Sequence, residues 1–215
     1  MDIFPLGHSS FRIKGKSVTV VTDPFDASLV GFPFPKHIAS DIVTVSHGHT
    51  DHNQTGLVEG NPYIVDGPGE YEIKGVGIIG IPLFHDDKKG TLRGSVTAYH
   101  MEIDNVNIVH LGDIGVVPNS DEVERLDGVD ILFVPVGGSV TLDLNQIAGV
   151  IAELEPSIVI PMHYKTSRHD TKNFGELTGV SEFLKIMGKE AISPVPKFSI
   201  TKDKLPAEMQ IVVLE

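Results

Sequence analysis

The segment VSHGHTDHNQTG, residues 45–56, constrains the fold most strongly, because it places three histidines and an aspartate within six positions directly after the apolar run DIVTVS. His47 and His49 are two positions apart and turn to the same side of an extended segment, whereas Asp51 and His52 lie beyond the turn. The pattern predicts one loop that can serve two metal ions. The alternative is a solvated polar loop, or a helix N-terminus capped by Thr50 or Asp51.

The absence of cysteine narrows the chemistry of such a site. The chain contains 10 histidines and no cysteine. Disulfide bonds and thiolate zinc cages are therefore excluded, and any metal must be held by imidazole and carboxylate groups.

Two other apolar runs also end directly in residues that can bind a metal. NVNIVHLGD ends at Asp113, and SIVIPMH ends at His163. A buried strand that stops at a ligand holds that ligand rigidly, as a preorganised site requires. Both residues are therefore candidates to complete the site that the histidine cluster begins.

Apolar runs rich in β-branched residues recur along the chain and predict strands, several of them buried on both faces. Besides the run that ends at Asp113, they begin at Ser17, Asp41, Pro62, Val76, Asp130 and Ser157. Helical spacing is found in residues 143–154 and 181–187. No linker or repeat divides the 215 residues, so we expect a single α/β domain over residues 1–215.

The charge and hydropathy of the chain exclude several classes of partner. A formal net charge of −12 works against a phosphate-binding surface, so we expect no nucleic-acid partner. No run approaches the roughly 20 apolar residues of a membrane-spanning helix, and the N-terminus lacks the features of a signal peptide. We therefore expect a cytoplasmic protein with no membrane partner. The sequence leaves the oligomeric state open, a homo-oligomer included.

The segment SHGHTDH resembles the signature of the metallo-β-lactamase fold superfamily, and spaced segments over nearly the whole chain support the resemblance. These are TDPF around Asp23, PLFHD around His85, HLGDIG around Asp113 and PMHYKT around His163. GHSSF, GPGEYE and PVGG are similar to segments of its branch of small cytoplasmic metal-dependent hydrolases related to ascorbate-6-phosphate lactonase. The resemblance implies a four-layer αβ/βα sandwich with metal ligands gathered at one edge.

The resemblance also implies a dinuclear metal centre with seven ligands. One ion would be bound by His47, His49 and His85, the other by Asp51, His52 and His163, and Asp113 would bridge them. This set of nitrogen and oxygen ligands suits zinc, with manganese or iron as competitors, and does not suit a soft thiophilic ion.

Two ions roughly 3.5–4 Å apart would share a water, lower its pKa and present hydroxide to an electrophilic carbon or phosphorus. Asp51 or Asp113 would shuttle the proton during departure of the leaving group. We therefore expect a hydrolase that acts on a small anionic metabolite, with a lactone or ester preferred. The alternatives are a phosphodiesterase and a non-catalytic metal-binding or redox protein.

Five further residues are candidates for roles next to the metals. Asp23 would hydrogen-bond a ligand histidine, although an Asp-Pro turn explains it equally well. His8 and His110 would donate hydrogen bonds to substrate or to ligand carboxylates, or else serve as structural histidines. Arg93 would clamp a substrate phosphate or carboxylate, and Tyr164 would donate to a developing oxyanion.

The remaining histidines and two lysines have simpler interpretations. His37, His100 and His169 match no motif and are expected at the surface or in packing, and Lys88 and Lys89 are expected in a solvated loop. Ser95 stands where an asparagine often follows the Arg-Gly pair in similar chains, so polar contacts to substrate differ there.

Overall fold

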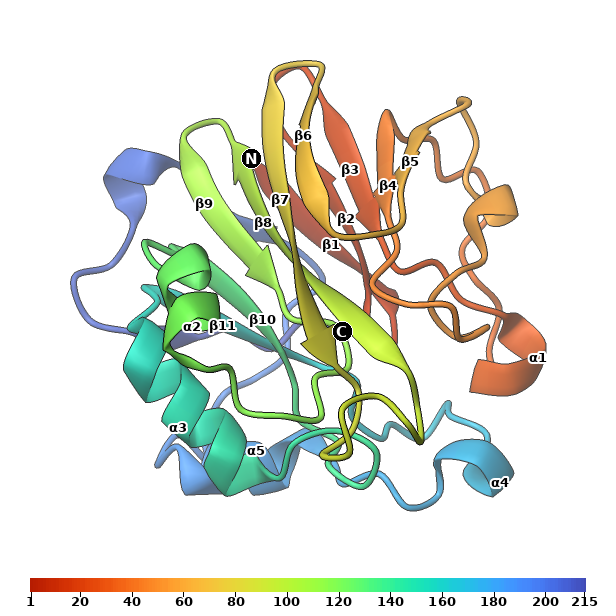
Figure 1. Ribbon diagram of the computed structural model, residues 1–215, viewed down its shortest axis with the longest axis vertical. Coiled ribbons are helices and arrows are strands. Elements are labelled where there is room, and N and C mark those ends of the chain that lie inside the picture. Colours follow the sequence, from red (N-terminus) through yellow and green to blue (C-terminus); the bar gives the residue numbers. More distant parts are fainter.

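Two β-sheets face each other in the computed structural model, which describes residues 1–215 (Figure 1). The six-stranded sheet has the order β12-β1-β2-β3-β4-β5. Its strands are β1 (Asp2–Gly7), β2 (Ser10–Lys14), β3 (Thr19–Thr22), β4 (Ile42–Thr44), β5 (Tyr63–Val65) and β12 (Phe198–Ser199). The sheet is mixed, because β1 to β3 pair antiparallel and β3 to β5 pair parallel.

The second sheet has seven strands in the order β13-β11-β10-β9-β8-β7-β6. They are β6 (Gly69–Ile73), β7 (Val76–Phe84), β8 (Ser95–Ile103), β9 (Val106–His110), β10 (Ile131–Pro135), β11 (Ile158–Met162) and β13 (Gln210–Ile211). The half from β9 to β13 is parallel and the half from β6 to β9 is antiparallel.

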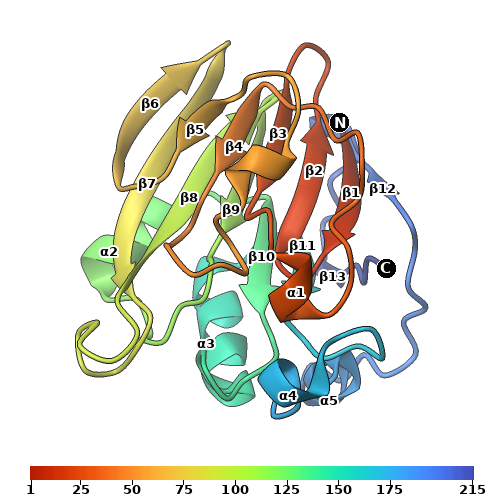
Figure 2. The same ribbon diagram turned by 90° about the vertical axis from the view of Figure 1, so that its right-hand side faces the viewer.

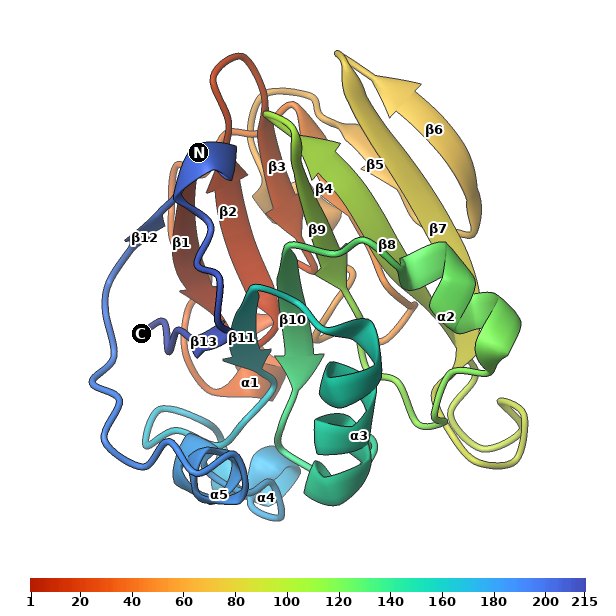
Figure 3. The same ribbon diagram turned by 90° about the vertical axis from the view of Figure 1, so that its left-hand side faces the viewer.

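The helices are short and lie outside the sheets. They are α1 (Ala27–Val30), α2 (Ser120–Leu126), α3 (Leu144–Leu154), α4 (Thr171–Phe174) and α5 (Val180–Ile186), with 3-10 turns at Thr55–Leu57 and Lys202–Lys204. Figure 3 shows α2 and α3 over the outer face of the seven-stranded sheet. None of the helices is long and apolar enough to cross a bilayer.

Alternation along the strands divides the core into layers. In β10, Ile131 and Phe133 belong to the core between the sheets, whereas Leu132 and Val134 pack in the core that includes α3 and α5. Because both faces of β10 are covered, the strand is apolar at every position. This explains why several strands are continuous apolar runs in the sequence.

The outer layer of the six-stranded sheet is mainly a loop, in contrast to a regular four-layer sandwich. Figure 2 shows the chain between β3 and β5 crossing this face with only α1 and one 3-10 turn. Phe25, Phe32 and Phe34 of this loop pack with Val21 and Val43 of the sheet. Large aromatic side chains therefore cover much of this face, and the expected α/β sandwich is confirmed.

Both expected helices are present. The helix expected over 143–154 is α3, and Asp143 caps it by accepting hydrogen bonds from the N–H groups of Asn145 and Gln146. The helix expected over 181–187 is α5, one residue earlier at each end.

Candidate metal centre

The candidate ligands follow the C-terminal ends of four strands from both sheets. His47, His49, Asp51 and His52 lie in the loop after β4, which belongs to the six-stranded sheet. His85 follows β7, Asp113 follows β9 and His163 follows β11, all of the seven-stranded sheet. The arrowheads of β7 and β9 point toward the same lower edge in Figure 1. The structure therefore brings together all seven residues that the sequence singled out.

The candidate ligand atoms form two groups, which a third group of His47, His52 and Asp113 connects. His47, His49 and His85 form one group, while Asp51, His52, His163 and His8 form another, each with ligand atoms within 4.8 Å of one another. The distances from Asp113 Oδ2 to the Nε2 atoms of His163, His52 and His85 are 3.0, 3.3 and 3.7 Å. Asp113 therefore lies between the groups, where a bridging ligand would be needed.

Buried polar atoms without partners indicate that the cluster is shaped for cations. His52 Nε2 and Asp113 Oδ1 are both buried without a hydrogen bond. Leaving such groups unpaired is costly unless an ion or another ligand satisfies them. The donor set of imidazole nitrogens and carboxylate oxygens is the one that zinc, manganese or iron prefers, so the residues fit the expected metal ions.

Burial gives His47 and His85 the neutral form that metal binding needs, whereas Asp113 and Asp23 outweigh burial and raise the pKa of His52. Burial lowers the pKa of His47 to about 3 and also lowers the pKa of His85, so both rings are neutral near pH 7. Burial alone would raise the pKa of Asp113, but the charges of His163 and His52 hold it well below its ordinary value. The carboxylate is therefore ionised and the two imidazoles keep free lone pairs.

Asp23 orients His52 from behind the centre. Its Oδ2 atom lies 2.8 Å from His52 Nδ1, and its carboxylate accepts hydrogen bonds from Ser46 N and Ser46 Oγ at 2.7 and 2.6 Å. Ser46 Oγ also lies 3.0 Å from His47 Nδ1. Ser46 thus links Asp23 to a second ligand, a role that its position next to His47 could have suggested but that no motif indicated.

His8 and His169 form a second line of contacts behind Asp51. His8 Nε2 lies 3.4 Å from Asp51 Oδ2, and His8 Nδ1 lies 3.2 Å from His169 Nε2. His169 Nδ1 accepts a hydrogen bond from the Thr166 N–H at 3.1 Å. His169 is only 5% exposed and lies 161 positions from His8, so no local pattern could have connected the two residues.

A cleft of about 360 Å³ opens onto the centre. His49, Asp51, His85, Asp113 and His163 line it together with Leu29, Arg93, Ser139, Val140, Lys172, Asn173, Phe174, Glu176 and Leu177. Arg93 comes from the loop between β7 and β8, and Lys172 comes from α4. Arg93 therefore borders the cleft as expected, and Lys172 is a second cation that the sequence did not single out.

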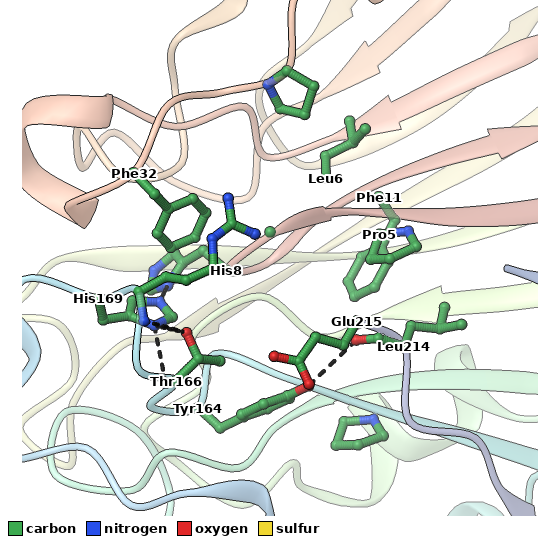
Figure 4. A pocket seen from close by; sticks show the side chains of 14 residues that line it. Pro5, Leu6, His8, Phe11, Phe32, Tyr164, Thr166, His169, Leu214 and Glu215 are labelled. Carbon is green, nitrogen blue, oxygen red and sulfur yellow. Dashed lines mark hydrogen bonds between the residues drawn. The ribbon is translucent and has the colours of Figure 1, made fainter. Parts of the chain in front are cut away.

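Tyr164 does not contact the metal cleft, contrary to expectation. Its hydroxyl donates to Leu214 O at 3.3 Å, and the ring lines a separate pocket of about 160 Å³ with His8 and His169 (Figure 4). The chain turns at His163, which has a φ angle of 51°, and Tyr164 therefore does not continue the face on which the ligand lies.

His110 likewise makes none of the contacts expected with substrate or ligand carboxylates. The ring is fully buried, Nε2 donates to Ser9 O at 3.0 Å, and Nδ1 accepts from Gly112 N at 3.3 Å. With both nitrogens held by backbone groups, His110 is a structural histidine.

Comparisons with known proteins agree with this geometry. The family model of a β-lactamase superfamily domain matches residues 2–163. A UPF0173 metal-dependent hydrolase of Thermococcus onnurineus is 32% identical in an alignment of 206 positions, and the match covers 81% of this chain and 90% of that protein.

Two solved structures with the same fold differ in how similar their sequences are to this chain. A Thermotoga maritima protein proposed to be a Zn-dependent hydrolase of the metallo-β-lactamase superfamily matches with a TM-score of 0.81 and 33% identity, over 99% of this chain and 97% of its own. An isothiocyanate hydrolase from Delia radicum gut bacteria matches with a TM-score of 0.69 and 15% identity, over 94% of this chain and 100% of its own. The second likeness concerns the fold alone.

Proposed function

The chain belongs to the β-lactamase superfamily and is a metal-dependent hydrolase, and from this premise we propose that it binds two divalent ions and hydrolyses a small anionic metabolite. Zinc is the preferred metal, with manganese or iron as competitors. The preferred substrate is a lactone or another ester. One fold supports many activities, so the substrate class must be argued from the site.

The observation that carries the dinuclear proposal is the position of Asp113 between two groups of ligand atoms. His47, His49 and His85 gather on one side, and Asp51 gathers with His52 and His163 on the other. Asp113 Oδ2 is within 3.7 Å of imidazoles from both groups. A single ion would leave one group of buried lone pairs unsatisfied, whereas two ions sharing Asp113 would use both.

Bound ions of this kind supply a water of lowered pKa and a positive charge that polarises the scissile bond. The chain's own residues hold and move the proton. The Asp51 side chain is 13% exposed and borders the cleft, whereas that of Asp113 is 2% exposed among imidazoles. Asp51 is therefore the carboxylate that can pass a proton to a leaving group in the cleft, and Asp113 holds its place as the bridge.

Two cations at the cleft support an anionic substrate. Arg93 and Lys172 reach the cleft from different segments, and the Arg93 guanidinium can bind a carboxylate or phosphate through two parallel hydrogen bonds. The same cleft contains Glu176, whose Oε2 atom lies 3.4 Å from Ser139 Oγ. A negative group on the substrate would therefore be directed toward Arg93 and Lys172 and away from Glu176.

Metal analysis and a substrate screen test the proposal. We expect freshly purified, unchelated protein to hold about two transition ions per chain. Protein reconstituted separately with zinc and with manganese should open lactones or cleave esters in a panel that also contains phosphodiesters and phosphorylated sugars. Preferential cleavage of phosphodiesters would replace the ester proposal, and about one ion per chain or fewer would contradict the dinuclear centre.

Ligand variants connect the metal to the activity. His49→Ala and Asp113→Ala should remain folded by circular dichroism and lose both metal and hydrolysis, because each removes a ligand from the centre. The matched control is His37→Ala, which removes an exposed imidazole whose partner is Glu59. It should retain metal and activity, and survival of activity in Asp113→Ala would contradict the proposed role of the bridge.

A further inference from the structure

A chain of contacts runs from the candidate metal centre through two histidines to a backbone N–H group. Asp51 faces His8, His8 contacts His169, and His169 contacts Thr166. Figure 4 shows His169 beside Thr166 at the wall of the pocket that lies behind the centre. The outermost contact determines which nitrogen of each histidine carries the proton.

The first step concerns the tautomer of His169. Its Nδ1 atom lies 3.1 Å from the backbone nitrogen of Thr166, and a backbone N–H can only donate. Nδ1 of His169 must therefore offer a lone pair and carry no proton. A ring without a proton on Nδ1 is neutral and carries its proton on Nε2, so the contact excludes both the charged form and the other tautomer.

The second step carries this assignment to His8. His169 Nε2–H lies 3.2 Å from His8 Nδ1, which must then accept the hydrogen bond. His8 therefore carries its own proton on Nε2, the atom that faces Asp51 Oδ2 at 3.4 Å. His8 Nε2 is buried without a formed hydrogen bond, and Asp51 Oδ2 is the carboxylate oxygen that lies next to it, at 3.4 Å.

This assignment decides between two possible roles of His8. By distance alone, His8 belongs to the same group of candidate ligands as Asp51, His52 and His163. A nitrogen that carries a proton has no lone pair to give to a metal ion. His8 is thereby a hydrogen-bond donor to a ligand and is prevented from acting as a ligand itself.

We propose that His169 is a positioning residue, which sets the tautomer of His8 so that His8 donates to Asp51 and holds that carboxylate in place for the metal. The proposal rests on the proposed function in one respect, the assignment of Asp51 as a ligand. Partners that orient ligands in this way typically contribute 10- to 100-fold, as an order of magnitude, to metal affinity.

The packing around His169 supports a fixed ring orientation. The ring meets those of Phe32 and Phe174 at centroid distances of 5.2 and 5.6 Å, both with T-shaped geometry. Next to it, Asp170 N donates to Val30 O at 2.9 Å and ties the segment to α1. Packing against two aromatic rings restricts rotation of the imidazole, which preserves the direction of the hydrogen bonds.

Two substitutions of His169 distinguish its effect on the His8 tautomer from its effect on local packing. His169→Asn places an amide oxygen near the position of Nδ1, which keeps the contact with Thr166 but leaves no donor for His8. His169→Gln places an amide nitrogen near the position of Nε2, which keeps the donor for His8. Thr166→Val is the matched control, because it removes the hydroxyl and leaves the backbone N–H that determines the tautomer.

Long-range ¹H–¹⁵N NMR spectra of the imidazole nitrogens report the tautomers directly, in metal-free protein. We expect His8 to be protonated on Nε2 in the wild type, in His169→Gln and in Thr166→Val, and to lose this preference in His169→Asn. Protonation of His8 on Nδ1 in the wild type would overturn the proposal. The wild-type spectrum therefore tests it even if a variant fails to fold.

Zinc binding supplies the second measurement. In competition with a fluorescent chelator, His169→Asn should lower the affinity for one of the two zinc ions by about 10- to 100-fold. The zinc affinities of His169→Gln and Thr166→Val should stay within about threefold of the wild type. Unchanged zinc affinity and an unchanged His8 tautomer in His169→Asn would overturn the proposal. If the protein shows the expected His8 tautomer and binds zinc but hydrolyses nothing, the proposed function is refuted and the role of His169 is not.

Discussion

At the scale of single residues, the centre depends on backbone conformations that side chains rarely adopt. His8, Asp23 and His163 have φ angles of 55°, 38° and 51°, in the left-handed region. Each such conformation costs about 1–3 kcal/mol and persists only where the surroundings hold it. The His163 N–H donates to His8 O at 3.2 Å, so two of these residues stabilise each other across the two sheets.

Asp23 allows a direct test of how much the residues behind the ligands contribute. Asp23→Asn should weaken zinc binding by about 10- to 100-fold and lower the free energy of unfolding by about 1–3 kcal/mol, because an amide group would face donors of Ser46 or His52. Chelator competition and urea unfolding measure the two effects. The control Asp26→Asn makes the same change at the N-cap of α1, where asparagine serves equally well and no effect is expected. Equal behaviour of the two variants would contradict the role of Asp23.

The residues that the sequence revealed are those with a strong local pattern. His47, His49, Asp51 and His52 are close in sequence, so their proximity in space needed no knowledge of the fold. Lys172 and His169 reach the site through contacts between distant segments, and no spacing indicates them. Adjacency to a motif was also misleading, because Tyr164 follows His163 and faces the other way.

At the scale of elements, close packing between strand ends fixes the ligands. Gly137 follows β10, and a Cβ atom at this position would lie 2.2 Å from His163 O. Gly137→Ala should therefore shift the His163 backbone, cost about 1–3 kcal/mol of stability and weaken zinc binding. Gly149→Ala in α3 is the control, since nothing lies near its Cβ position, and it should raise stability by about 0.5–1 kcal/mol. Thermal unfolding and zinc titration of both variants check this, and unchanged zinc affinity in Gly137→Ala would contradict it.

The elements that could be predicted are those buried on both faces. The runs that became β10 and β11 are apolar throughout, and β4 is buried at every position, because sheet and outer layer cover these strands completely. The two-residue strands β12 and β13 carry no periodic signal, since their pairing depends on neighbours far away in sequence. The aromatic loop over the six-stranded sheet was not predicted either, because a covering layer made by Phe25, Phe32 and Phe34 has no helical spacing.

At the scale of the whole molecule, the candidate centre joins the two sheets. The loop after β4 comes from the six-stranded sheet, and Asp113, His85 and His163 come from the seven-stranded one. A ligand that binds only the folded state stabilises it in proportion to its affinity and concentration. Metal binding is therefore expected to stabilise the contact between the sheets as well as to create the site.

In metal-free protein, the free energy of unfolding should depend on pH, and the buried histidines determine the sign of that dependence. Burial lowers the pKa of His8 and His47 to about 3, below the ordinary value of about 6.5, so below pH 6.5 the unfolded chain takes up protons that the folded chain refuses. Their contribution to the free energy of unfolding is fully present above pH 6.5. Below pH 6.5 the free energy of unfolding falls by up to about 1.4 kcal/mol per pH unit for each group. His52 has a raised pKa, and its opposite effect is confined to higher pH, since below 6.5 it is protonated in both states.

Chelated protein should therefore unfold at lower temperature at pH 5 than at pH 7.5. A hundredfold excess of zinc over its dissociation constant stabilises by about 2.7 kcal/mol for each ion bound, which should raise the unfolding temperature by about 5–10 °C per ion at pH 7.5. The increase should shrink at pH 5, because protons compete for the imidazole ligands. Scanning calorimetry of chelated and zinc-loaded protein at both pH values measures this, with Asp113→Ala as the variant in which zinc should have little effect. An equal zinc-dependent increase at pH 5 and pH 7.5 would show that the buried imidazoles do not bind the metal.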